Sequence, residues 1–240
     1  MKLTTLLGGS TAVLALNPSC APGGNFDLSH WSLQEPVGSG SSSSPRQIPS
    51  SRLQGCSGYQ DEWFFTAADD GGAMAMKVPA RSQCVTTPNS QHCRSELREQ
   101  NPATWDPRAA TNRLFAEVRV VRNDGEVCVG QIHIDDAVSH KPVAELYLDR
   151  AGNLNLGVQQ CRTCSQKRTP VTRLPGGGGA RFTYEIRYEK GKLAVAINGG
   201  ALKEFTTYDL DSPRSYFKAG NYNQGTGPTE VHFYQLKVSH

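Results

Sequence analysis

Apolar and polar residues alternate along several short segments of the chain, and this period of two is typical of β-strands that bury one face. The alternation occurs in residues 114–121, 126–134, 144–148, 154–158, 182–188, 193–197 and 230–238. No segment of useful length shows the three-to-four-residue spacing of an amphipathic helix. The pattern predicts a protein built almost entirely of strands.

Turn-forming residues between these segments predict three β-hairpins. Asn123-Asp-Gly125 follows the first strand, Asp149-Arg-Ala-Gly-Asn153 joins the next pair, and Glu189-Lys-Gly191 joins the third pair. Each hairpin has one apolar face, so we expect two antiparallel sheets packed face to face. The fold class predicted is an all-β jelly-roll sandwich with a concave face able to bind a substrate.

The beginning of the chain predicts a secretory signal peptide. Residues 1–15 have a short basic start and an apolar stretch too brief to cross a bilayer, with cleavage expected after Ala15. Cleavage after Ala21 suits the peptidase less well, because Pro22 follows. A first strand or helix of the fold is the alternative. We expect a flexible leading segment over 16–24, a single domain over 25–240, and a secreted, extracellular protein.

Seven cysteines in a secreted chain favour disulfides. Strict alternation places Cys128 on one face with Ile132 and Ile134, so it is expected to be buried and unpaired. The other six are expected to pair as Cys20–Cys56, Cys84–Cys93 and Cys161–Cys164. The chain has one CxxC and neither HxH nor HxxxH, so no metal site is expected.

Composition limits the classes of partner. The chain of 240 residues is 37% hydrophobic, which suffices for a core, and its formal net charge is +3. That charge is too small for a dense basic stripe, so we expect no nucleic acid and no membrane as partner. We expect the protein to act as a monomer.

Three strand-like segments carry polar side chains where a structural strand would not need them. In Arg94-Ser-Glu-Leu-Arg-Glu99, Arg94, Glu96 and Arg98 share one face. Two guanidinium groups beside a carboxylate form a row that binds anions. Taken alone, the same row is also consistent with a solvated outer face.

The second and third segments extend this pattern. Gln131 and His133 share a face in residues 126–134, opposite Ile132 and Ile134. In residues 216–224 the polar face carries Tyr216, Lys218, Gly220, Tyr222 and Gln224. Each of these two segments, taken alone, is also typical of an ordinary exposed strand. Together the three segments predict one concave face for an anionic, hydroxylated chain.

This set of groups suits β-elimination from a polyuronate. The proton next to a carboxylate becomes acidic only when the carboxylate is neutralised, a role for Arg94 and Gln131. His133 can then accept the C5 proton, and Tyr222 can protonate the departing glycosidic oxygen. The nearby cations should favour a neutral imidazole. No cofactor or metal is required.

At these segments the sequence resembles the alginate lyases of polysaccharide lyase family 7. The matching motifs are Arg-Ser-Glu-Leu-Arg-Glu at 94–99, Gln-Ile-His at 131–133 and Tyr-Phe-Lys-Ala-Gly-Asn-Tyr-Asn-Gln at 216–224, and Phe26-Asp-Leu-Ser-His-Trp31 resembles the family's opening. The resemblance implies a β-jelly roll whose concave sheet binds alginate, a polymer of mannuronate and guluronate. With the expected signal peptide, it predicts a secreted lyase that cleaves the 1,4-glycosidic bonds of alginate and leaves unsaturated uronate ends.

The resemblance also implies residue roles. Arg94, Gln131, His133 and Tyr222 would be catalytic, and Glu96, Arg98 and Lys218 would support them or bind substrate. In the family the tyrosine can act as both base and acid, so the base depends on which uronate is cleaved. Isoleucine within Gln-Ile-His accompanies tolerance of guluronate.

Three alternatives remain open on sequence grounds. A related lyase could act on another polyuronate such as glucuronan, and a carbohydrate-binding sandwich could use the same face without turnover. A glycoside hydrolase would need two carboxylic acids across a cleft. Glu96 is the only carboxylate on the three polar faces, and its arginine neighbours should lower its pKa.

Overall fold

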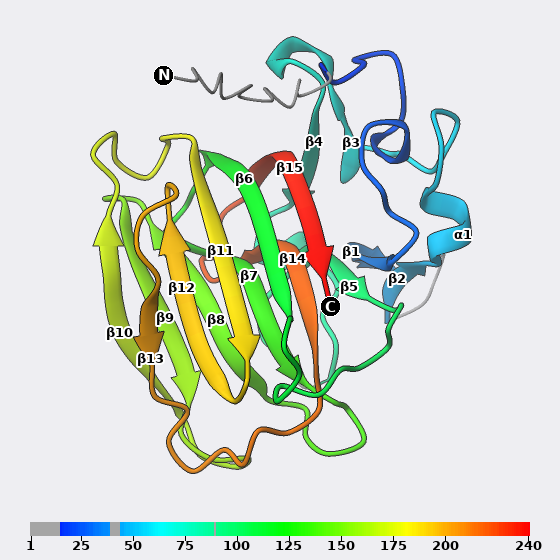
Figure 1. Cartoon of the computed structure of the whole chain (residues 1–240). Helices are drawn as coiled ribbons and strands as arrows, with labels where there is room; N and C mark the ends of the chain where they lie inside the picture. Colours follow the sequence, from blue (N-terminus) through cyan, green and yellow to red (C-terminus); the bar gives the residue numbers. More distant parts are fainter. Residues whose placement is uncertain (1–14, 39–43, 89) are drawn as a thin grey trace, which may run out of the picture.

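A computed structural model describes residues 15–38, 44–88 and 90–240, and its regular structure is almost entirely β (Figure 1). Two antiparallel sheets lie one behind the other in an open sandwich. This arrangement confirms the predicted jelly-roll class. The expected signal peptide lies outside the described residues, except for Ala15. None of the helices in the described ranges has the length and apolar character needed to cross a membrane.

The first sheet has eight strands in the order β10-β9-β8-β7-β14-β5-β1-β2. Their bounds are β1 Trp31–Gly38, β2 Pro45–Ile48, β5 Arg94–Glu99, β7 Glu126–Ile134, β8 Pro142–Asp149, β9 Asn153–Gln159, β10 Gln166–Arg173 and β14 Ser215–Asn223.

The second sheet has seven strands in the order β13-β12-β11-β6-β15-β4-β3. Their bounds are β3 Phe64–Ala67, β4 Ala73–Val78, β6 Arg113–Arg122, β11 Phe182–Glu189, β12 Lys192–Ile197, β13 Lys203–Phe205 and β15 Thr229–Ser239. Helical structure in the described residues is limited to short pieces: α1 Ser50–Leu53 and the 3₁₀ turns η1 Pro22–Gly24, η2 Ala68–Asp70 and η3 Arg81–Gln83.

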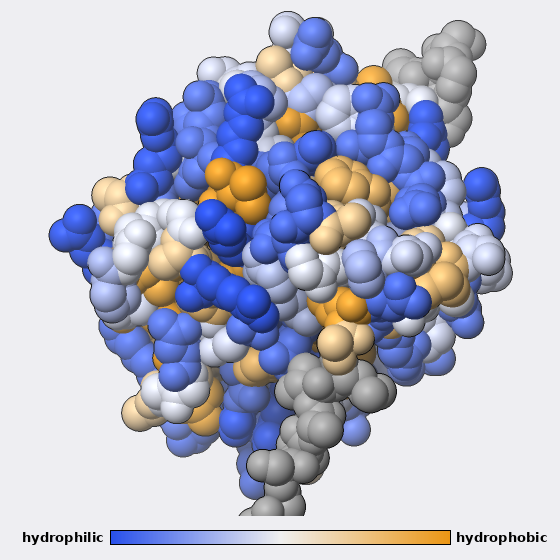
Figure 2. All heavy atoms as spheres, turned by 90° about the horizontal axis from the view of Figure 1, so that it is seen from above, coloured by the Kyte–Doolittle hydropathy of each residue, from blue (hydrophilic) through white to orange (hydrophobic). Residues whose placement is uncertain are grey.

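The core fills the space between the sheets. On β11 the alternating residues Phe182, Tyr184, Ile186 and Tyr188 are all at most 2% exposed, as the period of two predicted. The opposite sheet contributes Phe217 and other apolar side chains to the same cluster. Outside the core, the face shown in Figure 2 is mainly hydrophilic, with apolar side chains in small separate groups.

Two of the three predicted hairpins are confirmed, and one is wrong. Strands β8 and β9 pair with each other, as do β11 and β12. Strand β6, however, pairs with β11 and β15, whereas β7 pairs with β8 and β14. The turn at residues 123–125 therefore carries the chain from one sheet to the other. Alternation shows that each strand buries one face, but it does not reveal which strand lies beside it.

The cysteine predictions hold for pairing and burial but not for the face of Cys128. The structure has the three expected disulfides, and Cys128 is free and buried. A register shift in β7 between Cys128 and Gly130 reverses the expected parity. Cys128 lies opposite Tyr147 and Tyr222 rather than on the core face with Ile132.

The predicted leading segment, residues 16–24, makes defined contacts with the domain. Cys20 is joined to Cys56, and the N–H of Ala21 donates to the Cys56 carbonyl at 2.8 Å. Leu16 packs against the hydrophobic core. The contacts of Cys20 and Ala21 attach the segment to the chain just after α1, and Leu16 lies beside Gly72.

Candidate active site

The three polar segments form adjacent strands, with β14 between β5 and β7. Lys218 on β14 lies opposite Arg98 on β5 and Gln131 on β7, and Tyr222 lies opposite Arg94. Residues paired in this way place their side chains on the same face of an antiparallel sheet. The predicted polar side chains therefore share the sheet face that is turned away from the core, which we call the cleft face.

Glu96 is the centre of the polar contacts on the cleft face. One carboxylate oxygen, Oε2, accepts from Arg94 at 3.0 Å and lies 2.6 Å from the Lys218 ammonium. The other oxygen accepts from the Gln131 side-chain amide. Gly220 allows this close packing, because a Cβ there would lie 2.6 Å from the Glu96 Cα.

The buried charges explain how Glu96 titrates. Burial alone would raise the pKa of Glu96, but the cations of Lys218 and Arg94 reverse that effect and hold the pKa below its ordinary value. Glu96 is therefore ionised, and its contacts hold two cations and one amide in fixed positions. An ionised carboxylate cannot donate a proton to a leaving group.

His133 has the state required of a base. Its Nδ1 lies 2.9 Å from the Ile134 carbonyl oxygen, which only accepts, so Nδ1 carries the proton and Nε2 has the free lone pair. Burial, helped by the Lys218 cation, lowers the pKa of His133 to about 4. The ring stacks on Tyr216 at 5.1 Å between centroids. The neutral imidazole is thus fixed in one orientation.

Tyr222 is placed beside Arg94. The guanidinium carbon of Arg94 lies 3.7 Å from the centre of the Tyr222 ring. The Tyr222 hydroxyl lies 3.0 Å from the Ser90 hydroxyl. Burial raises the pKa of Tyr222, with an opposing effect from Arg94, so the phenol is protonated at neutral pH.

Arg98 lies on the cleft face of β5, two residues after Glu96, and its contacts are separate from those of Glu96. Its guanidinium pairs with Asp136 at 2.8 Å and lies 4.3 Å from the centre of the Tyr216 ring. The Tyr216 hydroxyl donates to the same aspartate at 3.1 Å. These contacts leave the Arg98 side chain about one-third exposed, 36%, so it can reach a ligand.

The four predicted catalytic residues line one cleft of about 350 Å³. Its walls are formed by Arg94, Gln131, His133, His140, Lys141, Pro142, Glu145, Gln159, Cys164, Ser165, Gln166 and Tyr222. Glu96 and Lys218 lie beneath these groups, at 1% and 5% exposure. In the described ranges, no group of three or more His, Cys, Asp or Glu residues is placed to hold a metal ion.

Sequence reasoning missed the part of the cleft that β8 and β10 supply. Glu145 lies opposite Gln131, and its Oε2 accepts from Tyr147 at 2.6 Å and from Gln166. Burial raises the pKa of Glu145. The sequence pattern could have shown this, because Glu145 and Tyr147 alternate with the apolar residues Ala144 and Leu146, as the polar residues of the three motifs do.

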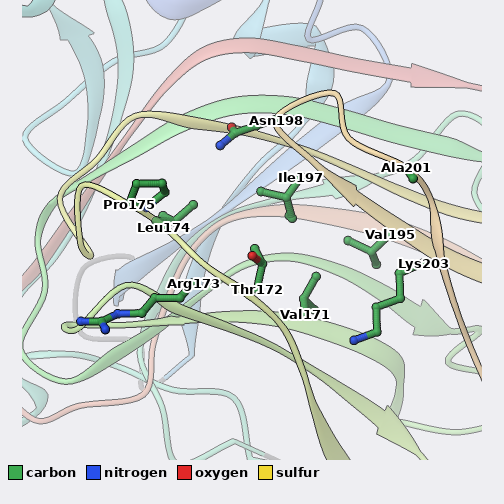
Figure 3. A pocket seen from close by; sticks show the side chains of 10 residues that line it. All are labelled: Val171, Thr172, Arg173, Leu174, Pro175, Val195, Ile197, Asn198, Ala201 and Lys203. Atoms are coloured by element: carbon green, nitrogen blue, oxygen red, sulfur yellow. The ribbon is translucent and has the colours of Figure 1, made fainter.

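A second hollow of about 430 Å³ lies at the open edge of the sandwich (Figure 3). Its walls come from β10, β12, the residues that follow these two strands, and the start of β13. The lining residues are Val171, Thr172, Arg173, Leu174, Pro175, Val195, Ile197, Asn198, Ala201 and Lys203. It is larger than the cleft but contains no imidazole, carboxylate or phenol. Chemistry rather than size therefore identifies the cleft as the candidate active site.

A family model described as alginate lyase matches residues 26–240, which is nearly the whole chain. The chain belongs to the alginate lyase family. This match confirms the resemblance inferred from the motifs at 94–99, 131–133 and 216–224. The protein is therefore an enzyme, a polysaccharide lyase, and its substrate is a polysaccharide.

Known alginate lyases resemble this member of the family over most of its length. An alginate lyase from Klebsiella pneumoniae is 27% identical over 285 residues, which cover 92% of this chain and 91% of the relative. The solved structure of the family 7 alginate lyase A1-II′, in a complex with product, is 32% identical with a TM-score of 0.78, covering 92% of this chain and 99% of that one. An alginate lyase from Pseudomonas aeruginosa is 28% identical with a TM-score of 0.75, covering 89% and 99%.

Proposed function

We propose that this alginate lyase cleaves the 1,4-glycosidic bonds of alginate by β-elimination. The reaction takes place in the cleft that lies over the outer face of β5, β14, β7 and β8. The observation that carries the proposal is that the neutral His133 imidazole and the protonated Tyr222 phenol line the same cleft as Arg94 and Gln131. A base, an acid and two donors for a carboxylate are the groups that this reaction needs.

The reaction begins with neutralisation of the uronate carboxylate. Arg94 and Gln131 donate hydrogen bonds to it, and these bonds strengthen as charge moves from C5 into the carboxylate. Glu96 holds both donors in place before substrate arrives. Because their positions are fixed in advance, little reorganisation is needed when the charge develops.

Proton transfer completes the elimination. Nε2 of His133 takes the C5 proton, the bond from C4 to the glycosidic oxygen breaks, and a C4–C5 double bond forms. The Tyr222 hydroxyl gives its proton to the departing oxygen. When proton and leaving oxygen lie on the same side of the sugar, Tyr222 can serve as both base and acid, so the role of His133 depends on the uronate cleaved.

Variants of a relative support these roles. Alginate lyase A1-II′ has been solved with a substrate when a histidine was replaced by asparagine and a tyrosine by phenylalanine. With the tyrosine replaced alone, it has been solved with a product. In this chain, Tyr222 lines the cleft together with two histidines, His133 and His140, of which His133 is the one beside Gln131 and Lys218 on the motif strands.

The test is to incubate the protein with alginate and record the ultraviolet absorbance of unsaturated uronate ends. His133→Asn and Tyr222→Phe should each lower this rate roughly 10²- to 10⁴-fold. Tyr234→Phe, on β15 of the other sheet, is the matched control. A folded wild-type protein that binds alginate without forming unsaturated ends would instead be a carbohydrate-binding module, and saturated products would indicate a hydrolase. Activity confined to glucuronan would change the substrate and keep the mechanism.

We also propose that the enzyme is secreted and that its signal peptide ends at Ala15. Three disulfides favour an oxidising compartment. The Cys20–Cys56 bond supports cleavage before Cys20, since cleavage after Ala21 would leave Cys56 without its partner. N-terminal sequencing of the exported protein should begin at Leu16, and a sequence beginning at Pro22 would contradict this site.

A further inference from the structure

A loop closed by a disulfide reaches the Tyr222 hydroxyl. Cys84 and Cys93 are bonded to each other, and Cys93 directly precedes Arg94 at the start of β5. Within this loop the N–H of Ser90 donates to the Thr87 carbonyl at 3.0 Å. The Ser90 hydroxyl lies on the cleft face, where it meets Tyr222.

The Ser90 hydroxyl joins two of the groups assigned to catalysis. It lies 3.0 Å from the Tyr222 hydroxyl and accepts from Nη2 of Arg94 at 3.2 Å. It also accepts from the His92 N–H at 3.1 Å and lies 3.0 Å from the His92 carbonyl. The His92 ring contacts Tyr222 edge-on at 6.0 Å between centroids. The loop thus holds the phenol by a hydroxyl and a ring.

The Ser90 hydroxyl has one proton and two lone pairs. Both lone pairs accept, one from Nη2 of Arg94 and one from the backbone N–H of His92. Its single proton goes either to the His92 carbonyl or to the Tyr222 oxygen, so Ser90 meets Tyr222 as a donor. When the hydroxyl turns toward Tyr222, it stabilises the phenolate left after proton transfer. A hydrogen bond to the charged form lowers the pKa of an acid.

We propose that Ser90 is a positioning residue for proton transfer by Tyr222 and that the Cys84–Cys93 disulfide holds it in place. The inference rests on the proposed function, because it concerns the acid of that reaction. Ser90 acts through Tyr222 and Arg94 and does not itself contact the substrate. No motif of the sequence contains it.

The first test replaces the hydroxyl. Ser90→Ala should lower kcat for alginate about tenfold and leave KM within about twofold, because the phenolate loses a donor while the substrate contacts remain. Ser90→Thr keeps the hydroxyl and should restore most of kcat. Ser82→Ala, in η3 on the protein surface, is the matched control and should match the wild type.

The pH profile separates positioning from a structural role. Loss of the donor raises the pKa of Tyr222, so the alkaline limb of kcat should move up by about one pH unit in Ser90→Ala. The other charged and titratable groups around the phenol are the same in both proteins: His92, Arg94, Glu96, Cys128, Glu145 and Lys218. An unmoved limb would overturn the proposal.

The second test opens the loop. In a Cys84→Ser/Cys93→Ser variant, kcat should fall as in Ser90→Ala, and adding Ser90→Ala should cause little further loss, because the hydroxyl is already displaced. Cys20→Ser/Cys56→Ser removes a disulfide outside the cleft and should lower the melting temperature while keeping kcat. The proposal would be contradicted if the fold-losses in kcat from opening the disulfide and from Ser90→Ala multiplied in the combined variant.

The two proposals fail in different ways. If wild-type protein forms no unsaturated ends, the lyase mechanism fails, and the role of Ser90, which rests on that mechanism, fails with it. If wild-type protein is active and Ser90→Ala keeps its kcat, or loses kcat only in step with its melting temperature, the mechanism stands and the role of Ser90 is refuted.

Discussion

The guanidinium carbon of Arg94 lies 3.7 Å above the Tyr222 ring, so the cation assigned to the substrate carboxylate also contacts the proton donor. Two functions that the mechanism separates are thereby coupled through one side chain. The planar guanidinium can stack on the ring and still donate to Glu96 at 3.0 Å. An ammonium group has no plane with which to do both.

Arg94→Lys should therefore lower kcat/KM roughly 10²-fold, although it preserves the charge. The loss comes from the stacking and from the second nitrogen needed for the carboxylate. Arg187→Lys, on the other sheet, should leave kcat/KM unchanged. Steady-state kinetics on alginate measure both, and near wild-type activity in Arg94→Lys would show that a point charge is sufficient.

The acid limb of the pH profile should lie near pH 4 rather than near the ordinary histidine value of about 6.5. His133 acts as a base only when neutral, and burial lowers its pKa to about 4, so activity persists through pH 5 and falls below it. The measurement is kcat/KM against pH, which reports the pKa values of the free enzyme, on a substrate cleaved with His133 as base. Activity that rises steadily toward pH 4 would exclude a histidine base.

Glu96→Ala should destabilise the fold by about 3–5 kcal/mol, because it leaves the cations of Arg94 and Lys218 buried without their anion. Urea unfolding at neutral pH measures the change. As a comparison, Glu204→Ala breaks an exposed pair with Lys192 and should cost less than about 1 kcal/mol. Equal costs for the two variants would mean that burial does not strengthen the Glu96 contacts.

Glu35→Gln should gain stability relative to the wild type as the pH rises. Glu35 is fully buried beside Asp61, its Oε1 has no partner, and burial raises its pKa to about 7. A carboxyl whose pKa is higher in the folded state destabilises the fold when it ionises. The wild-type protein therefore loses stability as the pH rises from the unfolded-state pKa of 4.5 to the folded-state pKa of about 7.

The free energy of unfolding of Glu35→Gln, taken relative to the wild type, should therefore be about 1–3 kcal/mol higher at pH 8 than at pH 5. Urea unfolding at both pH values gives the difference. The interaction of Arg46 with Glu35 can be kept by the glutamine oxygen, so the comparison isolates the charge. A pH-independent difference would mean that Glu35 does not titrate in this range.

The sequence predicted the strands and most of the candidate site, because alternation shows which face of a strand is buried. Arg94, Gln131, His133 and Tyr222 were predicted in this way, and they line one cleft because β5, β14 and β7 are adjacent. Pairing between strands depends on contacts distant in sequence, so the turn at 123–125 was interpreted as a hairpin.

Two further features depend on local geometry that composition does not encode. The register shift in β7 moves Cys128 from the core face to the cleft side, and strict alternation cannot anticipate it. Ser90 reaches Tyr222 from a loop 132 residues away along the chain, and only the folded structure brings the two together.

The proposed mechanism requires four side chains to act together on a single uronate, and a crystal structure of Tyr222→Phe with an alginate oligosaccharide would show this arrangement. We expect a uronate carboxylate within hydrogen-bond distance of Arg94 and Gln131, with its C5 facing Nε2 of His133. An oligosaccharide bound in the hollow between β10 and β12, or a cleft-bound uronate whose carboxylate points away from Arg94, would contradict it.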